Sequence, residues 1–466
     1  MMFATRCLID TFARAQCRLA LFLLPMILAS LAKATDFKLH STVKKPIPWG
    51  QIAFTRQGYL LLPVAQVVSL SEEELRRERE RRRRWLDRPT EEQVNELVQR
   101  EPGEDERSYR LRRSLAELYL RWLKANPHVA MPKEIKRARK VELLVVKPSL
   151  SGLDEVARIP LWEGDIDVVS QISHFGGRIF TKDMTNLWAG AIVGERWIAA
   201  WARIFSPRQR YDVTILVNAQ DFKQWSLLGE MHPLCWIDEK RLLVSMDKGG
   251  KPTLVELRLG EDGKVQEERL LAPSPSSRLS ATVVPETNQV LIKRAFVFHS
   301  LDLETGSITK AQHGFKVSGQ EIKIPKWTNF LIHDGHLWVV DRIRSKLYSL
   351  VLLQKASLRI VASWSLPRKM GEDFWDGPLL ALDSGLVLVR ERRFRRSLGR
   401  RATSGTSTGW GSLWFFDPKT SHTPQPLPLP DIRIESETQP ATLSPDGLWL
   451  ALRVDEQTLQ VWMVRK

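Results

Sequence analysis

The pentapeptide GTSTG at residues 405–409 has the Gly-x-Ser-x-Gly pattern of a catalytic serine. Hydrolases that use this pattern hold the serine on a sharp turn between a strand and a helix, where its hydroxyl is presented as a nucleophile. Here an arginine-rich segment precedes Ser407 and a strand-like segment follows it. The surroundings therefore predict that Ser407 is not a nucleophile.

Two histidines, His333 and His336, flank Gly335 and could contribute to a metal site. A zinc site needs three or four protein ligands, and no third ligand stands at a recognisable spacing from this pair. We therefore interpret both as solvated histidines of a turn. We expect neither a metal nor a cofactor.

Arginine is concentrated in a few short segments, and we take part of this set as candidate partner-binding residues. The candidates are Arg392, Arg393, Arg395, Arg396, Arg400, Arg401, Arg208 and Arg210. Arg203 stands in the same segment as the last two, and a further run covers residues 81–84. Guanidinium groups bind carboxylate, phosphate and sulfate through paired hydrogen bonds. The alternative is a solvated charge run.

Three tryptophans, Trp188, Trp327 and Trp375, stand in or near segments that join one repeat of the chain to the next. If exposed, they would stack on sugar rings or anchor a partner protein. If buried, they would pack between repeats, and the large area that an indole buries favours this reading. All three are kept as candidate partner-binding residues.

One structural unit recurs along the chain, and it consists of an apolar stretch, a tight turn and a longer apolar stretch. The copies are QIAFTRQGYLLLPV, LWAGAIVGERWIAAW, PLCWIDEKRLLVSM, SATVVPETNQVLIK, NFLIHDGHLWVV, PLLALDSGLVLV and PATLSPDGLWLAL. Each predicts a hairpin, and a third strand follows each hairpin. A more polar fourth strand completes several units. The sequence therefore predicts an all-β, seven-bladed β-propeller, although six to eight blades are compatible with it.

The spacing of the units supports this fold and locates two insertions. The turn positions Gly194, Glu239, Thr287, Gly335 and Gly385 follow one another at intervals of 45, 48, 48 and 50 residues. Two longer intervals are explained by a charged segment at 71–140 and by the arginine-rich arm at 391–411. About 20 residues near 163–187 stay unassigned, and an eighth, irregular blade would fit there.

The segment 71–140 has a helical pattern and is predicted to be an insertion within blade one. Ser71 with Glu74, and Thr90 with Gln93, have the spacing of capping boxes. An apolar stripe follows, formed by Leu111, Leu115, Leu118, Tyr119 and Trp122. We expect this stripe to pack on neighbouring helices or on the propeller, with a partner-binding surface as the alternative.

Chain direction predicts that both insertions emerge from one face of the ring. In a four-stranded meander, the connection from the second to the third strand and the connection to the next blade share one edge. The helical segment and the arm each join a second strand to a third, in blades one and six. The segment DFKLHST at 36–42 is predicted to supply the outer strand of the last blade, because it would cover an otherwise open edge.

The first residues predict export. Arg14 and Arg18 precede the apolar run 19–32, and Ala32-Lys33-Ala34 has the pattern of a cleavage site. We therefore expect a signal peptide at 1–34, a propeller at 35–466 and a periplasmic or secreted protein. The apolar run is shorter than the roughly 20 residues of a membrane span, and an uncleaved anchor is the alternative. Cys235 would be the single cysteine of the mature chain, so no intramolecular disulfide is expected.

Three features of the chain resemble known propeller families. The segment SPDGLWLAL at 444–452 resembles the repeat of exported Tol-system and related bacterial propellers. The segment LDLETG at 301–306 resembles a turn of quinone-dependent dehydrogenase blades, and the blade spacing is similar to that of Trp-Asp (WD40-like) repeats. The Trp-Asp pair that closes the third strand of Trp-Asp repeats is absent here, and so is the tryptophan that usually follows the Thr-Gly turn of quinone enzymes.

We predict a non-enzymatic binding or scaffold protein whose basic propeller face binds a protein or an anionic cell-envelope polymer. The net charge is +16, and it would be +13 without residues 1–34, which hold four cations and one anion. An excess of this size favours an anionic partner. The alternative is a propeller enzyme, lactonase-like or quinoprotein-like, with its site at the central channel. No base-reading motif is present, so sequence-specific binding of nucleic acid is not expected.

Overall fold

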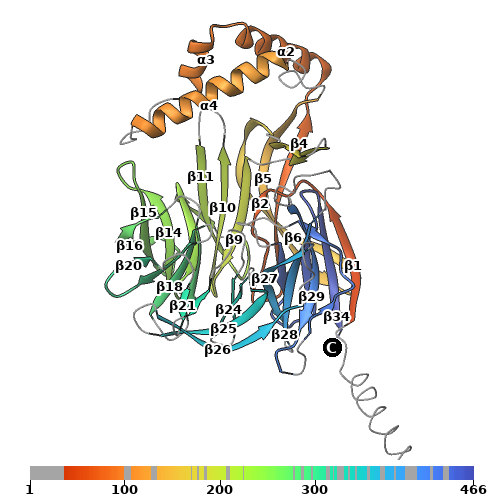
Figure 1. The fold of residues 1–466 in the computed structure, drawn as a ribbon, viewed down its shortest axis with the longest axis vertical. Helices are drawn as coiled ribbons and strands as arrows, with labels where there is room; N and C mark the ends of the chain where they lie inside the picture. Colours follow the sequence, from red (N-terminus) through yellow and green to blue (C-terminus); the bar gives the residue numbers. More distant parts are fainter. Residues whose placement is uncertain are drawn as a thin grey trace, which may run out of the picture.

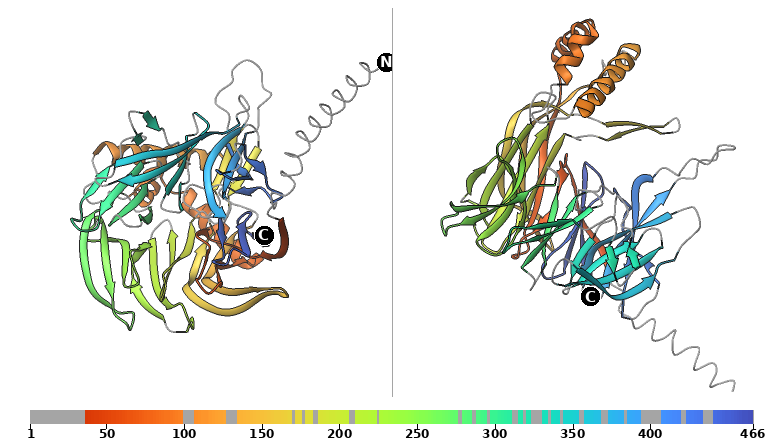
Figure 2. Two further views of the ribbon diagram at one scale, coloured as in Figure 1. Left: turned by 90° about the horizontal axis from the view of Figure 1, so that it is seen from below. Right: turned by 60° about the vertical axis from the view of Figure 1, so that its left-hand side comes forward.

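The protein is described from a computed structural model of the chain. The described residues are 36–98, 106–126, 134–168, 171–175, 178–182, 186–205, 210–223, 225–275, 279–284, 288–294, 297–310, 315–317, 320–322, 330–333, 336–341, 344–353, 357–367, 373–382, 385–393, 407–419, 423–433 and 440–465. The strands form separate antiparallel sheets around a common axis, and three helices stand above one end of the ring (Figures 1 and 2).

Seven sheets of at least four strands make up the ring, so the predicted seven-bladed propeller is confirmed. Blade one consists of β3 (Ala53–Phe54), β4 (Leu60–Ser69), β5 (Lys136–Ser149) and β6 (Gly152–Asp167). Blade two consists of β9 (Leu187–Val193), β10 (Trp197–Phe205), β11 (Arg210–Asn218) and β12 (Trp225–Gly229). Blade three consists of β13 (Met231–Trp236), β14 (Arg241–Asp247), β15 (Pro252–Leu259) and β16 (Val265–Pro273).

The second half of the chain repeats the same order of strands. Blade four consists of β17 (Ser280–Val284), β18 (Gln289–Arg294), β19 (Val297–Asp302) and β20 (Ile308–Lys310). Blade five consists of β23 (Phe330–His333), β24 (His336–Asp341), β25 (Lys346–Leu353) and β26 (Ser357–Ser365). Blade six consists of β27 (Asp373–Leu382), β28 (Gly385–Arg393), β29 (Ser407–Phe416), β30 (Gln425–Pro426) and β31 (Ile432–Arg433).

The last blade is built from both ends of the described chain. Its strands are β32 (Ala441–Leu443), β33 (Trp449–Arg453), β34 (Thr458–Arg465) and β1 (Asp36–Lys44). β1 pairs antiparallel with β34, from Asp36 opposite Arg465 to Lys44 opposite Thr458. The predicted outer strand from the N-terminal segment is therefore confirmed, and it extends to residue 44.

A second contact reinforces this closure. The Arg453 side chain at the end of β33 is 4% exposed, and its guanidinium donates hydrogen bonds to the carbonyl oxygens of Ile47 (2.7 Å) and Pro48 (2.8 Å). The same guanidinium lies 4.6 Å from the ring centroid of Trp49. Two charge-assisted hydrogen bonds and a cation–π contact thus tie the segment after β1 to the last blade.

Two short hairpins lie outside the blades. They are β7 (Gln171–Phe175) with β8 (Arg178–Lys182), and β21 (Phe315–Val317) with β22 (Gln320–Ile322). The first lies in the unassigned segment 163–187, and the described residues of this segment form only this two-stranded sheet, the end of β6 and the first residue of β9, not an eighth blade. A further strand, β2 (Trp49–Gly50), pairs in parallel with β9. Gly50 permits this approach, because a Cβ there would lie 2.0 Å from the Ala189 carbonyl oxygen.

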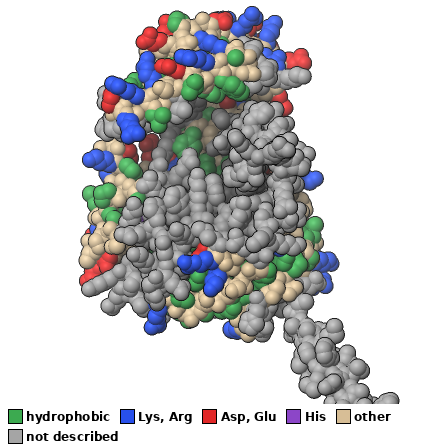
Figure 3. All heavy atoms as spheres, in the orientation of Figure 1, with side chains coloured by type: hydrophobic (Ala, Val, Ile, Leu, Met, Phe, Trp, Pro, Cys, Tyr) green, Lys and Arg blue, Asp and Glu red, His purple; other side chains and the backbone are tan. Residues whose placement is uncertain are grey.

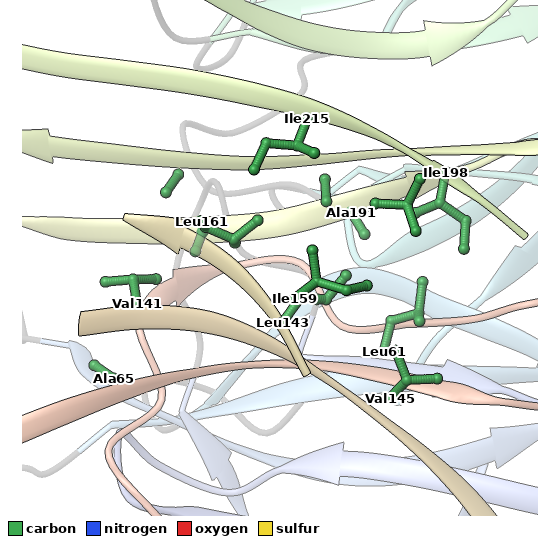
Figure 4. Packing of buried hydrophobic residues seen from close by; sticks show 14 of the residues in the cluster. Leu61, Ala65, Val141, Leu143, Val145, Ile159, Leu161, Ala191, Ile198 and Ile215 are labelled. Carbon is green, nitrogen blue, oxygen red and sulfur yellow. The ribbon is translucent and has the colours of Figure 1, made fainter. Parts of the chain in front are cut away.

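The core lies between neighbouring blades. Middle strands are buried on both faces, as in β10, where eight of nine residues are buried. Side chains from β4, β5 and β10, among them Leu61, Val145 and Ile198, meet in the largest cluster (Figure 4). Continuous apolar strands thus mark positions between two adjacent sheets.

The inserted helices are α2 (Glu72–Leu86), α3 (Thr90–Leu97) and α4 (Glu106–Ala125). The capping box of Ser71 and Glu74 is confirmed. The second predicted box is wrong, because Pro89 is the N-cap residue of α3 and makes no side-chain capping hydrogen bond. The segment also ends before residue 140, since β5 begins at Lys136.

Candidate partner-binding face

The helices stand on the longest strands of the propeller. β4, β5 and β6 contain 10, 14 and 16 residues, and the helices connect β4 to β5 (Figure 1). Every blade runs from its inner to its outer strand, except that the last is completed by β1. The ends of β4 and β28 therefore reach one face of the ring, which we call the insertion face.

An ionic cluster fixes α2 to the extended strands. Glu78 is buried, and its carboxylate accepts hydrogen bonds from Arg81 (2.6 and 2.8 Å) and from Arg82 (2.9 Å). Arg82 and Arg137 in turn donate to the two oxygens of Asp167 at the end of β6, each at 2.9 Å. Part of the arginine run at 81–84 is thus used to hold the helices in place.

The protonation of Glu78 depends on this cluster. Burial raises the pKa of Glu78, but hydrogen bonds from Arg81 and Arg82 more than offset this effect, and the net pKa lies below its ordinary value. The carboxylate is therefore charged at neutral pH, where it bridges helix and strand.

Helix α4 rests on α3 through one of its two apolar sides. Leu120 and Leu123 of α4 are buried, as is Val94 of α3. The Lys124 ammonium donates to the Arg88 carbonyl oxygen (3.0 Å) and to the Thr90 hydroxyl (3.2 Å). This side of α4 therefore has its partner within the chain.

The other apolar side of α4 has no such cover. The exposed fractions of Leu111, Leu118, Tyr119 and Trp122 are 61%, 61%, 53% and 43%. The rings of Tyr119 and Trp122 stack on each other with centroids 6.2 Å apart. Figure 3 shows hydrophobic side chains over the helical segment. The expectation that this stripe packs within the chain is thus wrong for these four residues, and the alternative of a binding surface is favoured. The side chain of Leu115 is not described.

The arginine candidates are placed only in part. Arg392 and Arg393 end β28, where their backbones pair with Asp373 and Ser407. Arg210 begins β11 opposite Phe205. The side chains of these three are not described, and Arg208, Arg395, Arg396, Arg400 and Arg401 lie outside the described residues. Their role in binding stays a prediction.

Two of the tryptophan candidates belong to the packing between blades. Trp375 is 2% exposed, and its indole NH donates to the Pro367 carbonyl oxygen at 2.8 Å. Trp188 is half-buried in β9 and packs against the largest core cluster. A partner cannot reach Trp375, so this prediction is wrong in favour of the packing alternative, and Trp188 is largely used in the same way. Trp327 lies outside the described residues.

Arg203 is also structural, in contrast to the prediction that groups it with surface arginines. It is buried in β10, and its guanidinium donates to Asp212 on β11 at 2.7 Å. This pair is a cross-strand contact of blade two, because the two residues are directly opposite in the register. Burial of a paired guanidinium removes it from the set available to a partner.

The residues considered for chemistry lie in ordinary structural surroundings. Ser407 begins strand β29 rather than a helix. The imidazole of His336 contacts the Ser349 hydroxyl at 2.6 Å (Nδ1 to Oγ). Burial raises the pKa of the Cys235 thiol to about 12. Within the described part of the chain, no group of three His, Cys, Asp or Glu side chains could hold a metal. No described helix has the length and hydropathy needed to cross a membrane.

The stripe on α4 carries a signal that sequence analysis could have found. Arg107 stands four residues before Leu111, and Arg121 stands three residues after Leu118, so both are neighbours of the stripe on the helix surface. An apolar side bordered by arginines, opposite a second apolar side with Leu120 and Leu123, predicts a helix with more apolar surface than its own neighbours cover.

Comparisons with known proteins concern the fold. No protein-family model and no curated protein matches the chain. Similar solved structures include a chain of the mitotic checkpoint complex, 8% identical over 94% of each chain with a TM-score of 0.44. The C-terminal WD40 domain of Sif2 is 10% identical over 71% of this chain and 93% of that one, with a TM-score of 0.37. A puromycin hydrolase mutant complexed with PGG is 14% identical over 68% and 48%, with a TM-score of 0.36.

The sheet topology and the site define a class of protein. The chain is a seven-bladed β-propeller with a helical insertion in blade one. Its insertion face carries an exposed apolar helix side bordered by arginines.

Proposed function

We propose that the protein is a non-catalytic scaffold that binds another protein through its insertion face. The observation that carries this proposal is the exposed apolar side of α4, held on extended strands by the buried Glu78 cluster. A helix with large apolar side chains in water is unfavourable unless a partner covers it, and exposed patches of this kind mark interaction sites.

The proposal includes location and charge. The export pattern at 1–34 supports a periplasmic or secreted scaffold, and the net charge of +13 that the chain has without these residues supports a partner with an acidic surface. Because charge guides encounter and the apolar stripe supplies buried area, the two features act on different steps of one association. An anionic polymer of the cell envelope is the competing occupant for the arginine-rich arm.

Photo-crosslinking in the native cell tests the face. A photoreactive residue is placed at Ser114 on α4 or at Arg393 at the end of β28, and at Lys240 in a turn of the opposite face as the matched control. We expect adducts of defined mass from the insertion face and none from Lys240. Adducts only from Lys240 would show that the wrong face has been chosen. Replacing the six arm arginines with serine should also reduce retention on heparin if the arm binds polyanions, and unchanged retention would exclude the arm.

A further inference from the structure

Helix α4 is the part of the insertion face whose occupant can be argued from the described residues. Leu111, Leu118 and Trp122 follow at spacings of seven and four residues, so they align along one side of the helix, and Tyr119 lies next to them. Apolar side chains at these spacings are the residues through which one helix packs on another. The stripe is thus shaped for a helix.

The charge along the stripe restricts the kind of helix. The sequence of α4 contains six basic and two acidic residues, a net charge of +4. Of the basic ones, Arg113 and Lys124 face α3, where they contact Asn95 and Thr90. Arg110 pairs with Glu106 at 2.8 Å. Arg107 and Arg121 form no ion pair with a carboxylate of the described residues, and both are exposed beside the stripe.

A second copy of the chain does not suit this surface. An antiparallel pair of α4 helices would bring Arg107 of one copy towards Arg121 of the other, and like charges in contact are destabilising. Helix α3 does not cover this side either, because it contacts the opposite side of α4 through Leu120 and Leu123, and the stripe stays exposed in the described part of the chain. Among the described residues Arg107 and Arg121 have no carboxylate partner, so both are available to carboxylates of another protein.

We propose that the outer side of α4, formed by Leu111, Leu118, Tyr119 and Trp122, binds an acidic amphipathic helix of a partner protein, with Arg107 and Arg121 pairing with its carboxylates. The inference rests on the proposed scaffold function and names the partner class for that face. Tyr119 and Trp122 are the expected centre of the contact, because aromatic side chains that become fully desolvated dominate interface energies. The arginines set the sign of the partner's charge.

Two synthetic peptides test the charge preference. Both are helical, with the same leucine stripe, and one has glutamate and the other lysine on its polar side. Fluorescence anisotropy with the full chain should show the glutamate peptide binding at least about tenfold more tightly, and the difference should shrink as salt is added. Equal affinities would overturn the proposal.

Variants of the chain locate the contact. The double variant Leu118→Ser with Trp122→Ser should weaken binding of the glutamate peptide by about tenfold or more. The matched control replaces Leu270 and Val361 with serine, because these are exposed by 62% and 50% on the outer strands of blades three and five. Circular dichroism and the melting transition verify that each variant is folded. Equal losses in the variant and the control would refute a specific site on α4.

Arg107 and Arg121 are tested by replacing both with glutamine. This change should remove most of the preference for the glutamate peptide, whereas the affinity for the lysine peptide should rise or stay constant. Sedimentation velocity tests whether a second copy of the chain occupies the stripe. Dimers of the unmodified chain that disappear in the variant Leu118→Ser would assign the stripe to self-association and overturn the proposal. In the cellular experiment, adducts from Arg393 with none from Ser114 would overturn this inference and leave the scaffold function standing.

Discussion

Arg453 is expected to stabilise the closed ring more than any exposed arginine of the last blade. The variant Arg453→Met removes the guanidinium, so the carbonyl groups of Ile47 and Pro48 lose their hydrogen bonds and Trp49 loses its cation. Methionine keeps much of the apolar stem in place. The change therefore removes the polar contacts of Arg453 and leaves most of the packing of its side chain in place.

The magnitude follows from three contacts. Hydrogen bonds from a charged donor contribute about 1.5–3 kcal/mol each, and a desolvated cation–π contact contributes about 2 kcal/mol. Part of this is offset, because methionine is buried at less desolvation cost than guanidinium. We expect a net loss of about 3–5 kcal/mol in the free energy of unfolding. This is a large part of the roughly 5–15 kcal/mol by which folded proteins are stable.

Equilibrium unfolding in urea, followed by tryptophan fluorescence, measures this loss. Arg465→Met is the matched control, because it makes the same substitution at an exposed position in β34 of the same blade. The control should change the free energy of unfolding by less than about 0.5 kcal/mol. A loss below about 1 kcal/mol for Arg453→Met would refute the reasoning that these contacts hold the ring closed.

Three further predictions concern other contacts. Phe37→Ala removes a buried anchor of β1 and should destabilise the chain by about 3–5 kcal/mol in the same urea assay, so a change under 1 kcal/mol would count against closure by β1. Glu78→Gln should speed hydrogen exchange in α2 without shifting the main unfolding transition. Folding lowers the Glu78 pKa, so the ion pairs of Glu78 stabilise α2 fully above the ordinary carboxyl pKa and are lost as pH falls through the lowered value. Hydrogen exchange in α2 of the unmodified chain should therefore be faster at acid pH. Cys235, with its pKa raised to about 12, should react with a thiol reagent at pH 8 only after unfolding, and rapid reaction in the native protein would contradict its burial.

The blades were predictable because they depend on local pattern. Each hairpin has its apolar stretches and turn within about 15 residues, and the turn residues repeat at regular spacing. Closure by β1 was also predictable, since the last unit lacked an outer strand. Contacts between distant segments were not predictable. The parallel pairing of β2 with β9 and the hydrogen bond from Arg453 to the Ile47 carbonyl oxygen join residues that no sequence periodicity relates.

The site was harder to predict because charge alone does not separate bound from free arginines. Arg82 and Arg203 are paired with Asp167 and Asp212, and each partner comes from another strand or element. The stripe on α4 was recognised, but its exposure depends on which of two apolar sides meets α3. That choice is made by tertiary packing, which the helical pattern does not contain.

Closure by β1 also has a consequence for the order in which the ring is completed. During synthesis Asp36 emerges well before Arg465, its opposite residue, which lies more than 400 positions later. At about 5–20 residues per second, β1 is made on the order of 20–90 s before its pairing strand. A chain interrupted at any point before β34 therefore has six or fewer complete sheets, and β1 has no strand to pair with. Unpaired strands of this kind are prone to pair with strands of other molecules. Completion of the last strand is what separates a closed ring from an aggregation-prone fragment.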